Sequence, residues 1–144
     1  MMRNTDGTES MLKLDERLQR DTFQLASLPL CELLLLNNAH YPWLILVPRR
    51  AGVNEVYQLE QTDRDQLWRE SHQLSLWMSD YFAFDKLNIG ALGNVVSQLH
   101  LHHVGRRQND PAWPGPVWGH GATVSYRSEQ VEGLIAAIRR GMES

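Results

Sequence analysis

The stretch Gln98-Leu99-His100-Leu101-His102-His103-Val104 decides how this chain of 144 residues is interpreted. Side chains along a β-strand point to opposite faces in turn, and this stretch alternates in the same way. The pattern predicts that His100 and His102 share one face of a strand while Leu99 and Leu101 point into a core. Two imidazoles at this spacing fit either a nucleophile with a supporting histidine or a pair of metal ligands.

Composition narrows the class of protein. The length suits one domain with its own hydrophobic core. A formal net charge of -3 argues against the basic surface of a nucleic-acid-binding protein, so we expect no nucleic-acid partner. The single cysteine, Cys31, excludes an internal disulfide framework and fits the reducing cytoplasm. We therefore expect a cytoplasmic protein.

No targeting or membrane segment is expected. The first twenty residues lack an apolar run of the kind that a secretion signal requires. The most hydrophobic region, residues 28–47, is divided by Asn37-Asn38 and Tyr41-Pro42 into runs too short for a membrane span of about 20 helical residues. We expect residues 1–11 to form a flexible tail and residues 12–144 to form one domain without a membrane partner.

The order of expected elements is that of a mixed α+β fold. Apolar runs bounded by turn residues predict strands over residues 31–36, 43–47, 86–92 and 98–104. Gly93-Asn94 is expected to turn the third of these strands into its antiparallel partner. Helical spacing predicts a long helix that Thr62 caps together with Asp65, and a last helix that Ser128 caps. Three prolines exclude regular structure from residues 110–118.

These motifs together resemble the histidine triad (HIT) family, whose signature is His-φ-His-φ-His-φ-φ, with φ apolar. Gln98, His100 and His102 align with the three triad positions. Residues 87–90 with Gly93-Asn94 are similar to the family's phosphate-side segment, and residues 112–116 are similar to its Trp-Pro-rich tail. Residues 44–50 are similar to its apolar strand, which ends in Pro and two basic residues. The chain most resembles the small bacterial branch with Gln at the first triad position.

The resemblance covers roughly residues 12 to 120 and carries several expectations. It implies a five-stranded antiparallel sheet with one long helix and a C-terminal helix. It also implies a homodimer about a two-fold axis, to which Trp68 and Trp77 of the long helix would contribute unless they pack internally. The implied partner is a purine nucleotide or nucleotide conjugate, and the implied chemistry needs no metal or other cofactor.

The family's chemistry assigns unequal roles to the triad positions. The resemblance makes His100 the nucleophile toward the α-phosphorus of a nucleoside phosphate conjugate, with a covalent nucleotidyl-histidine intermediate. A neutral imidazole can attack near pH 7 without first losing a proton. His102 is expected to fix the tautomer and orientation of His100. Gln98 forms hydrogen bonds but takes up no proton, so it is expected to position a phosphate or leaving group.

Other residues are expected to bind the nucleotide. Asn94 aligns with a phosphate-contacting Gln of the family, and main-chain amides from Gly93 onward add donors. Asn88 is expected on the sugar-phosphate side, and Asn37 and Asn38 stand where relatives have an acidic ribose-binding residue. Trp113, together with Trp118, is expected to cover the site or to reach a second subunit.

Departures from the family pattern keep two other functions open. The first triad position is Gln98, and Ala51 stands where relatives often have a histidine. His103 occupies an apolar position of the signature and is expected to be an edge or interface histidine. One alternative is a catalytically weak nucleotide sensor. The other is a metal-binding protein that uses His100 and His102 as ligands.

Overall fold

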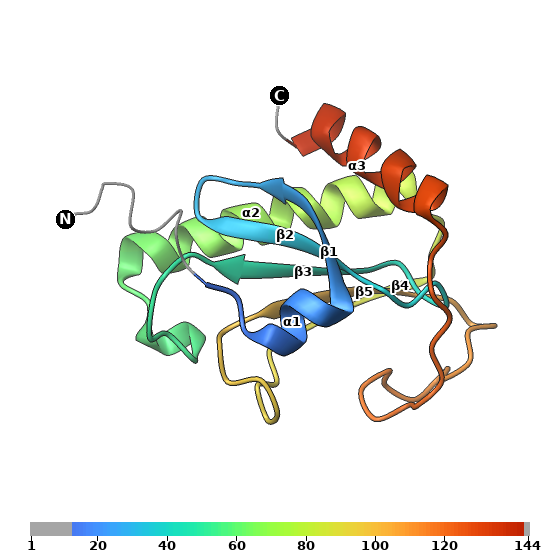
Figure 1. The fold of residues 1–144 in the computed structure, drawn as a ribbon, viewed down its shortest axis with the longest axis horizontal. Coiled ribbons are helices and arrows are strands. Elements are labelled where there is room, and N and C mark those ends of the chain that lie inside the picture. The colour runs from blue at the N-terminus through green and yellow to red at the C-terminus, as the bar shows by residue number, and fades with distance from the viewer. Residues whose placement is uncertain (1–12, 143–144) are drawn as a thin grey trace.

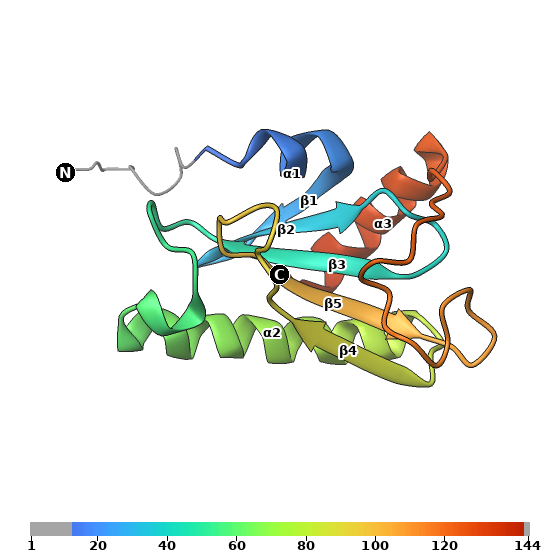
Figure 2. The same ribbon diagram turned by 90° about the horizontal axis from the view of Figure 1, so that it is seen from below.

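The computed structural model describes residues 13–142, which form an antiparallel sheet covered by helices and long irregular segments (Figure 1). In chain order the elements are α1 (Glu16–Asp21), β1 (Thr22–Ser27), β2 (Cys31–Leu36), β3 (Trp43–Pro48), the 3-10 helix η2 (Val56–Gln58), α2 (Gln61–Tyr81), β4 (Lys86–Gly90), β5 (Leu101–Arg106) and α3 (Ser128–Met142). The five strands lie in the order β1-β2-β3-β5-β4 (Figure 2). The expected α+β fold with a five-stranded antiparallel sheet is confirmed.

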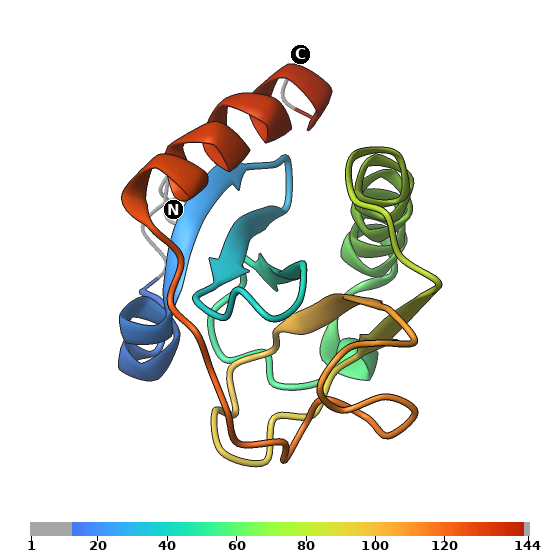
Figure 3. The same cartoon turned by 90° about the vertical axis from the view of Figure 1, so that its right-hand side faces the viewer.

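The two faces of the sheet are covered differently. Helices α2 and α3 lie on one side, where Leu74 of α2, Ile138 of α3 and Leu101 of β5 belong to one apolar cluster (Figure 3). The other face carries a second cluster that includes Trp43 and Val117, and irregular chain lies over it. Because side chains of β5 alternate between these faces, neighbouring residues of one strand enter different environments.

The long helix forms where apolar spacing predicts it. Its buried residues include Leu67, Leu74 and Met78, which lie seven and four positions apart, on one side of the helix, and belong to the core cluster. The helix begins at Gln61 after the N-cap residue Glu60, which makes no side-chain capping bond. The expected Thr62 cap is therefore wrong by two residues, because packing of the apolar stripe outweighs the capping signal.

The hairpin that carries the histidines is looser than expected. Strands β4 and β5 pair in antiparallel fashion, with Gly90 opposite His102. However, β4 ends at Gly90 and β5 begins at Leu101, so residues 91–100 form an irregular loop instead of a two-residue turn at Gly93-Asn94. His100 therefore precedes the strand, and this loop can form one wall of a cavity.

The remaining expectations concern the ends of the chain and the membrane. The last helix spans Ser128–Met142, so Ser128 is its first residue and the expected cap is wrong by one residue, because the Arg127 carbonyl already accepts from the Val131 N–H. Residues 110–118 contain no helix or strand. The expected tail, residues 1–11, lies outside the described residues. Within residues 13–142, no helix combines the length and the hydropathy needed to cross a bilayer.

Candidate active site

A cavity of about 340 Å³ lies beside His100, between the loop of residues 91–100 and the segment that follows Val117. Three of the expected phosphate- and ribose-binding residues line it together with His100, namely Asn38, Gly93 and Asn94. Its volume falls within the range of about 300–1,000 Å³ that is common for small-molecule sites. The fold therefore brings the expected nucleophile and several expected binding residues to one cavity.

The main chain holds His100 in one tautomer. Its Nδ1 lies 2.7 Å from the carbonyl oxygen of Gln98, and the side chain is 7% exposed. A carbonyl oxygen only accepts, so the proton of the neutral imidazole lies on Nδ1. The lone pair therefore lies on Nε2, the atom that a nucleophile needs. The Gln98 carbonyl, instead of the expected His102, determines this tautomer.

His102 is kept neutral beside the nucleophile. The indole N–H of Trp43 donates to Nδ1 of His102 at 2.9 Å, so the single proton of the neutral ring lies on Nε2. Burial, reinforced by the nearby His100 and His103, lowers the pKa of His102 to about 3. The rings of His100 and His102 meet edge to face with centroids 4.9 Å apart. His102 thus supports His100 by ring contact and can donate from Nε2.

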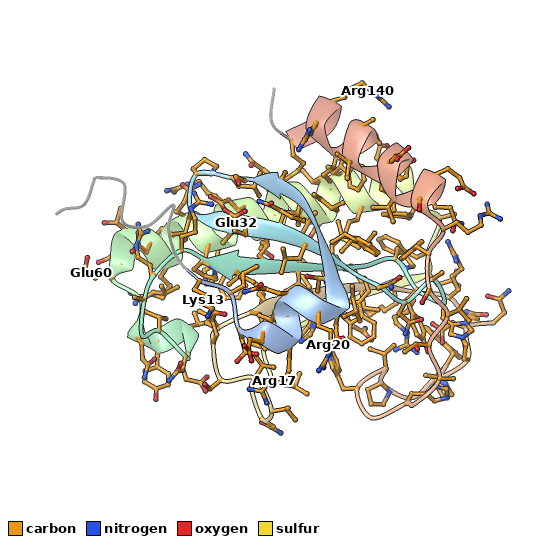
Figure 4. All side chains as sticks on the ribbon, in the orientation of Figure 1. Lys13, Arg17, Arg20, Glu32, Glu60 and Arg140 are labelled. Atoms are coloured by element: carbon orange, nitrogen blue, oxygen red, sulfur yellow. The ribbon has the colours of Figure 1, made fainter. Side chains whose placement is uncertain are left out.

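The Gln98 side chain binds the segment before α1. Its Oε1 accepts from the main-chain N–H of Asp15 at 2.8 Å, and its Nε2 donates to the carbonyl of Lys13 at 3.2 Å. These bonds join the end of the 91–100 loop to the segment just before α1. The basic side chains Arg17 and Arg20 lie on α1, and Lys13 lies just before it (Figure 4). Both ends of the Gln98 amide therefore have main-chain partners.

Asp15 lies near the site but remains ionised. Hydrogen bonds from Arg17 lower the pKa of the Asp15 carboxyl, and the nearby His100 contributes a smaller effect in the same direction. The main-chain N–H of Arg17 and its guanidinium both donate to this carboxylate. Asp15 therefore caps α1 and holds no proton near neutral pH.

His103 belongs to the opposite face of β5. Its side chain is fully buried, with Nε2 2.7 Å from the Ser71 hydroxyl of α2 and Nδ1 3.2 Å from the Leu101 carbonyl. Burial lowers the pKa of His103 to about 4. The expectation of an edge or interface histidine is wrong, because β5 lies between β3 and β4 and α2 covers this face.

Two of the expected binding residues instead surround a buried arginine. The Arg106 guanidinium donates to Asn88 Oδ1 at 2.9 Å and lies 5.7 Å from the centre of the Trp113 ring. It also pairs with Asp110 at 2.8 Å and donates to the Gly115 carbonyl at 2.8 Å. Asn88 and Trp113 therefore help to shape the segment that leads to the cavity wall, and neither is among the residues that line the cavity.

The two neighbouring asparagines have different surroundings. Asn38 lines the cavity, and its Oδ1 accepts from the main-chain N–H of His40 at 3.1 Å. Asn37 accepts instead from the main-chain N–H of Tyr126 at 2.8 Å. Asn37 thus anchors the segment before α3, while Asn38 remains beside the cavity.

Sequence reasoning missed several residues of the site. Trp43 supports His102 from β3, which pairs with β5 directly. His120 and Thr123 line the cavity from the segment before α3. Only the register between strands could have indicated Trp43, and no local pattern marks His120 or Thr123.

The metal-binding alternative lacks a third ligand. Within residues 13–142, no group of three or more His, Cys, Asp or Glu side chains is arranged to hold a metal ion. In addition, Nδ1 of His102 accepts from Trp43, so its Nε2 carries the proton and offers no lone pair to a metal ion. The arrangement of the pair therefore favours nucleophilic chemistry over metal coordination.

Comparison with protein families shows which family the chain belongs to. The model of the HIT domain matches residues 17–109, which include most of the sheet, α2 and the paired histidines. The chain belongs to the HIT family. Its sheet and its long helix are thus those of the nucleotide-binding HIT fold.

Solved structures of other HIT proteins are similar over almost the whole chain. A histidine triad protein from Marinobacter aquaeolei VT8 is 47% identical, with a TM-score of 0.88 over 92% of this chain and 96% of that one. A histidine triad (HIT) protein from Sinorhizobium meliloti 1021 is 41% identical, with a TM-score of 0.89 over 93% and 99%. One from Bradyrhizobium japonicum is also 41% identical, with a TM-score of 0.88 over 91% and 98%. None of the curated proteins matches this chain.

Proposed function

We propose that this HIT protein is a cytoplasmic nucleotide hydrolase or nucleotidyl transferase that acts on a purine nucleotide conjugate. The observation that carries the proposal is the bond from His100 Nδ1 to the Gln98 carbonyl, 2.7 Å long, beside a cavity of nucleotide size. This bond leaves the lone pair of Nε2 for attack on phosphorus. A nucleotide sensor would need the cavity but not this tautomer.

The proposed reaction has two steps. The Nε2 lone pair of His100 attacks the α-phosphorus, the bond from phosphorus to the leaving group breaks, and the leaving group departs with the electron pair. The attacked ring becomes positively charged, and its Nδ1–H still donates to the Gln98 carbonyl, which stabilises that charge. Water or another acceptor then attacks phosphorus, the P–N bond breaks, and its electron pair returns to His100.

The polar residues of the cavity suit the phosphate and the sugar. The Asn94 amide and main-chain amides near Gly93 would donate to the nonbridging oxygens, and neutral His102 would add its Nε2–H. Asn38 would accept from a ribose hydroxyl. The apolar wall residues Trp43 and Val117 would contact the base.

We further propose that two copies pair through the long helix and the outer strand. Large apolar side chains remain exposed there, namely Trp68, Leu76 and Tyr81 on α2 and Ile89 on β4. The Trp77 ring, in contrast, stacks on Tyr81 with centroids 4.8 Å apart and packs against the core of its own subunit. Exposed aromatic and aliphatic side chains of this kind favour a subunit contact.

Trapping of the intermediate tests the proposal. After brief incubation with adenosine 5′-phosphoramidate, intact-mass analysis of the wild-type protein should show the mass of one adenylyl group. His100→Ala should lose this adduct and slow hydrolysis by more than about 10³-fold, because it removes the nucleophile. His72→Ala is the matched control, because it removes an exposed histidine of α2 away from the cavity.

The same experiment separates the alternatives. The affinity of His100→Ala for AMP, measured by equilibrium dialysis, should match that of the wild type. Hydrolysis that survives in His100→Ala would disprove the covalent mechanism. Binding of AMP by the wild type without an adduct or hydrolysis would identify a nucleotide sensor.

A further inference from the structure

The triad residues supply a nucleophile but no proton for the leaving group. His102 is neutral, because burial lowers its pKa to about 3. Gln98 has no acidic proton, and both ends of its amide bind the main chain of Lys13 and Asp15. Asp15 is ionised through its bonds to Arg17. An amine or alkoxide leaving group needs a proton as its bond to phosphorus breaks, so the proton must come from another residue or from water.

His120 is in the right place to provide this proton. It lines the same cavity as His100, and these two are the titratable side chains among the described residues that line it. Among residues 13–142, none makes a hydrogen bond or an ion pair with the His120 imidazole, whose side chain is exposed. Both of its nitrogens are therefore available to a bound substrate and to water.

Main-chain contacts on either side hold His120 at the cavity. The main-chain N–H of His120 donates to the carbonyl of Val117, a buried residue, at 3.0 Å. Between them, Gly119 has φ +91°, a backbone conformation that favours glycine. Beyond the cavity, the Val124 carbonyl accepts from the main-chain N–H of Ala39 at 2.6 Å. The segment that lines the cavity with His120 is thus held at Val117 and at Val124.

We propose that His120 is a further catalytic residue, the proton donor to the leaving group, in an inference that rests on the function proposed above. When His100 Nε2 attacks phosphorus, the imidazolium of His120 gives its proton to the departing atom. The neutral His120 then takes a proton from the water that attacks the nucleotidyl-His100 intermediate. The P–N bond breaks, the nucleotide leaves, and both histidines return to their first protonation states.

Leaving groups of different basicity test this role. Adenosine 5′-(N-butyl phosphoramidate) releases an amine that must be protonated, whereas adenosine 5′-(4-nitrophenyl phosphate) releases a stable phenolate. With His120→Ala, release of butylamine should slow by about 10²–10⁴-fold, the usual contribution of a general acid. The first burst of nitrophenolate should stay within about threefold of wild type, because that step needs no acid. Since the second step loses its base, the adenylyl adduct on His100 should also accumulate.

Two further variants serve as controls. His120→Gln keeps a polar side chain of similar size and should show the same dependence on the leaving group as His120→Ala. His72→Ala should match the wild type with both substrates. A nitrophenolate burst that slows as much as butylamine release would overturn the role of His120, as would unchanged butylamine release. A wild-type protein that forms no adduct with either substrate would overturn the proposed function itself.

Discussion

The two faces of β5 treat neighbouring histidines in opposite ways. His102 and His103 are adjacent and both buried, and burial lowers the pKa of each. On the His103 face, α2 packs down and Ser71 bonds the imidazole in a closed core. On the His102 face, irregular segments leave a cavity beside His100, whose ring meets that of His102 edge to face. The covering elements, more than the strand, decide which histidine is available for chemistry.

The difference lies in how each cover is attached. Apolar packing holds α2 and α3 on their face, and Glu70 of α2 also accepts from the main-chain N–H groups of Leu30 and Cys31. On the other face, Leu18 and Val117 belong to a smaller apolar cluster. Polar side chains also attach the irregular chain there, since Gln98 binds residues 13–15 and Arg106 binds Asp110 and Gly115. These hydrogen bonds satisfy the polar groups of the irregular chain, and the cavity lies on this face of the sheet.

The largest expected effect on stability comes from replacing Arg106, which holds irregular chain against the face of the sheet that carries the cavity. Arg106 and Asp110 are 2% and 5% exposed, and the guanidinium makes further bonds to Asn88 and Gly115. Arg106→Met should lower the free energy of unfolding by about 3–5 kcal/mol, because it leaves a buried carboxylate without its partner. Urea denaturation followed by tryptophan fluorescence measures this change.

A double variant checks the cause. In Arg106→Met with Asp110→Asn, the buried charge is gone while an amide oxygen can still accept from the main-chain N–H groups of Ala112 and Trp113. The double variant should therefore regain part of the lost stability. If it is less stable than Arg106→Met alone, loss of packing and not an unpaired charge explains the effect.

Acid should destabilise both faces through their histidines. Because the unfolded histidines titrate near pH 6.5 and the folded ones near 3 and 4, only the unfolded chain gains these protons as the pH falls below about 6.5. Their stabilising contribution is complete above that pH and declines down to the folded pKa values. Each histidine should contribute up to about 1.4 kcal/mol per pH unit, measured by urea denaturation between pH 6 and 4.5.

Single variants divide this pH dependence between the faces. His103→Gln should remove about half of the change in unfolding free energy with pH, and His102→Gln should remove the other half. The carboxyl of Asp110, whose pKa Arg106 lowers to about 2, contributes only below about pH 4 and so lies outside this window. If His102→Gln leaves the pH dependence of the free energy of unfolding unchanged while His103→Gln reduces it, water reaches His102 on the cavity side of the sheet more than it reaches His103 under α2.

Short-range patterns in the sequence were sufficient to predict four of the five strands and the central pair of histidines, whereas the fifth strand, β1, followed only from the family resemblance. Alternation placed His100 and His102 together, and the rings do meet at 4.9 Å. Apolar spacing predicted α2 and α3 to within a few residues. These features depend on residues that are close together in the chain, so their spacing can be seen in a single sequence.

The partners of the site residues depend on distant parts of the chain. Gln98 bonds to Asp15, 83 positions away, and Trp43 bonds to His102, 59 positions away. Likewise, His103 lies in a core only because the sheet order puts β5 between β3 and β4. No local period encodes such pairings, so the roles expected for Gln98 and His103 could not be refined before the fold was known.

The smallest expected effect separates the side chain of Gln98 from its main chain. Gln98→Ala removes the bonds to Lys13 and Asp15 but keeps the carbonyl that orients His100. The free energy of unfolding should fall by about 1 kcal/mol, as for a typical hydrogen bond. Hydrogen exchange at the Asp15 amide should become faster, while kcat/KM for adenosine 5′-phosphoramidate should fall by less than about tenfold, since 1.4 kcal/mol corresponds to that factor.

Gln98→Glu provides the matched control, because a carboxylate keeps an acceptor for the Asp15 N–H and loses the donor to the Lys13 carbonyl. Exchange at Asp15 should then stay slower than in Gln98→Ala. A much larger loss of kcat/KM in Gln98→Ala, with exchange at Asp15 unchanged, would show that the amide acts on the substrate. In that case the cavity face would use its polar residues for chemistry as well as for attaching its cover.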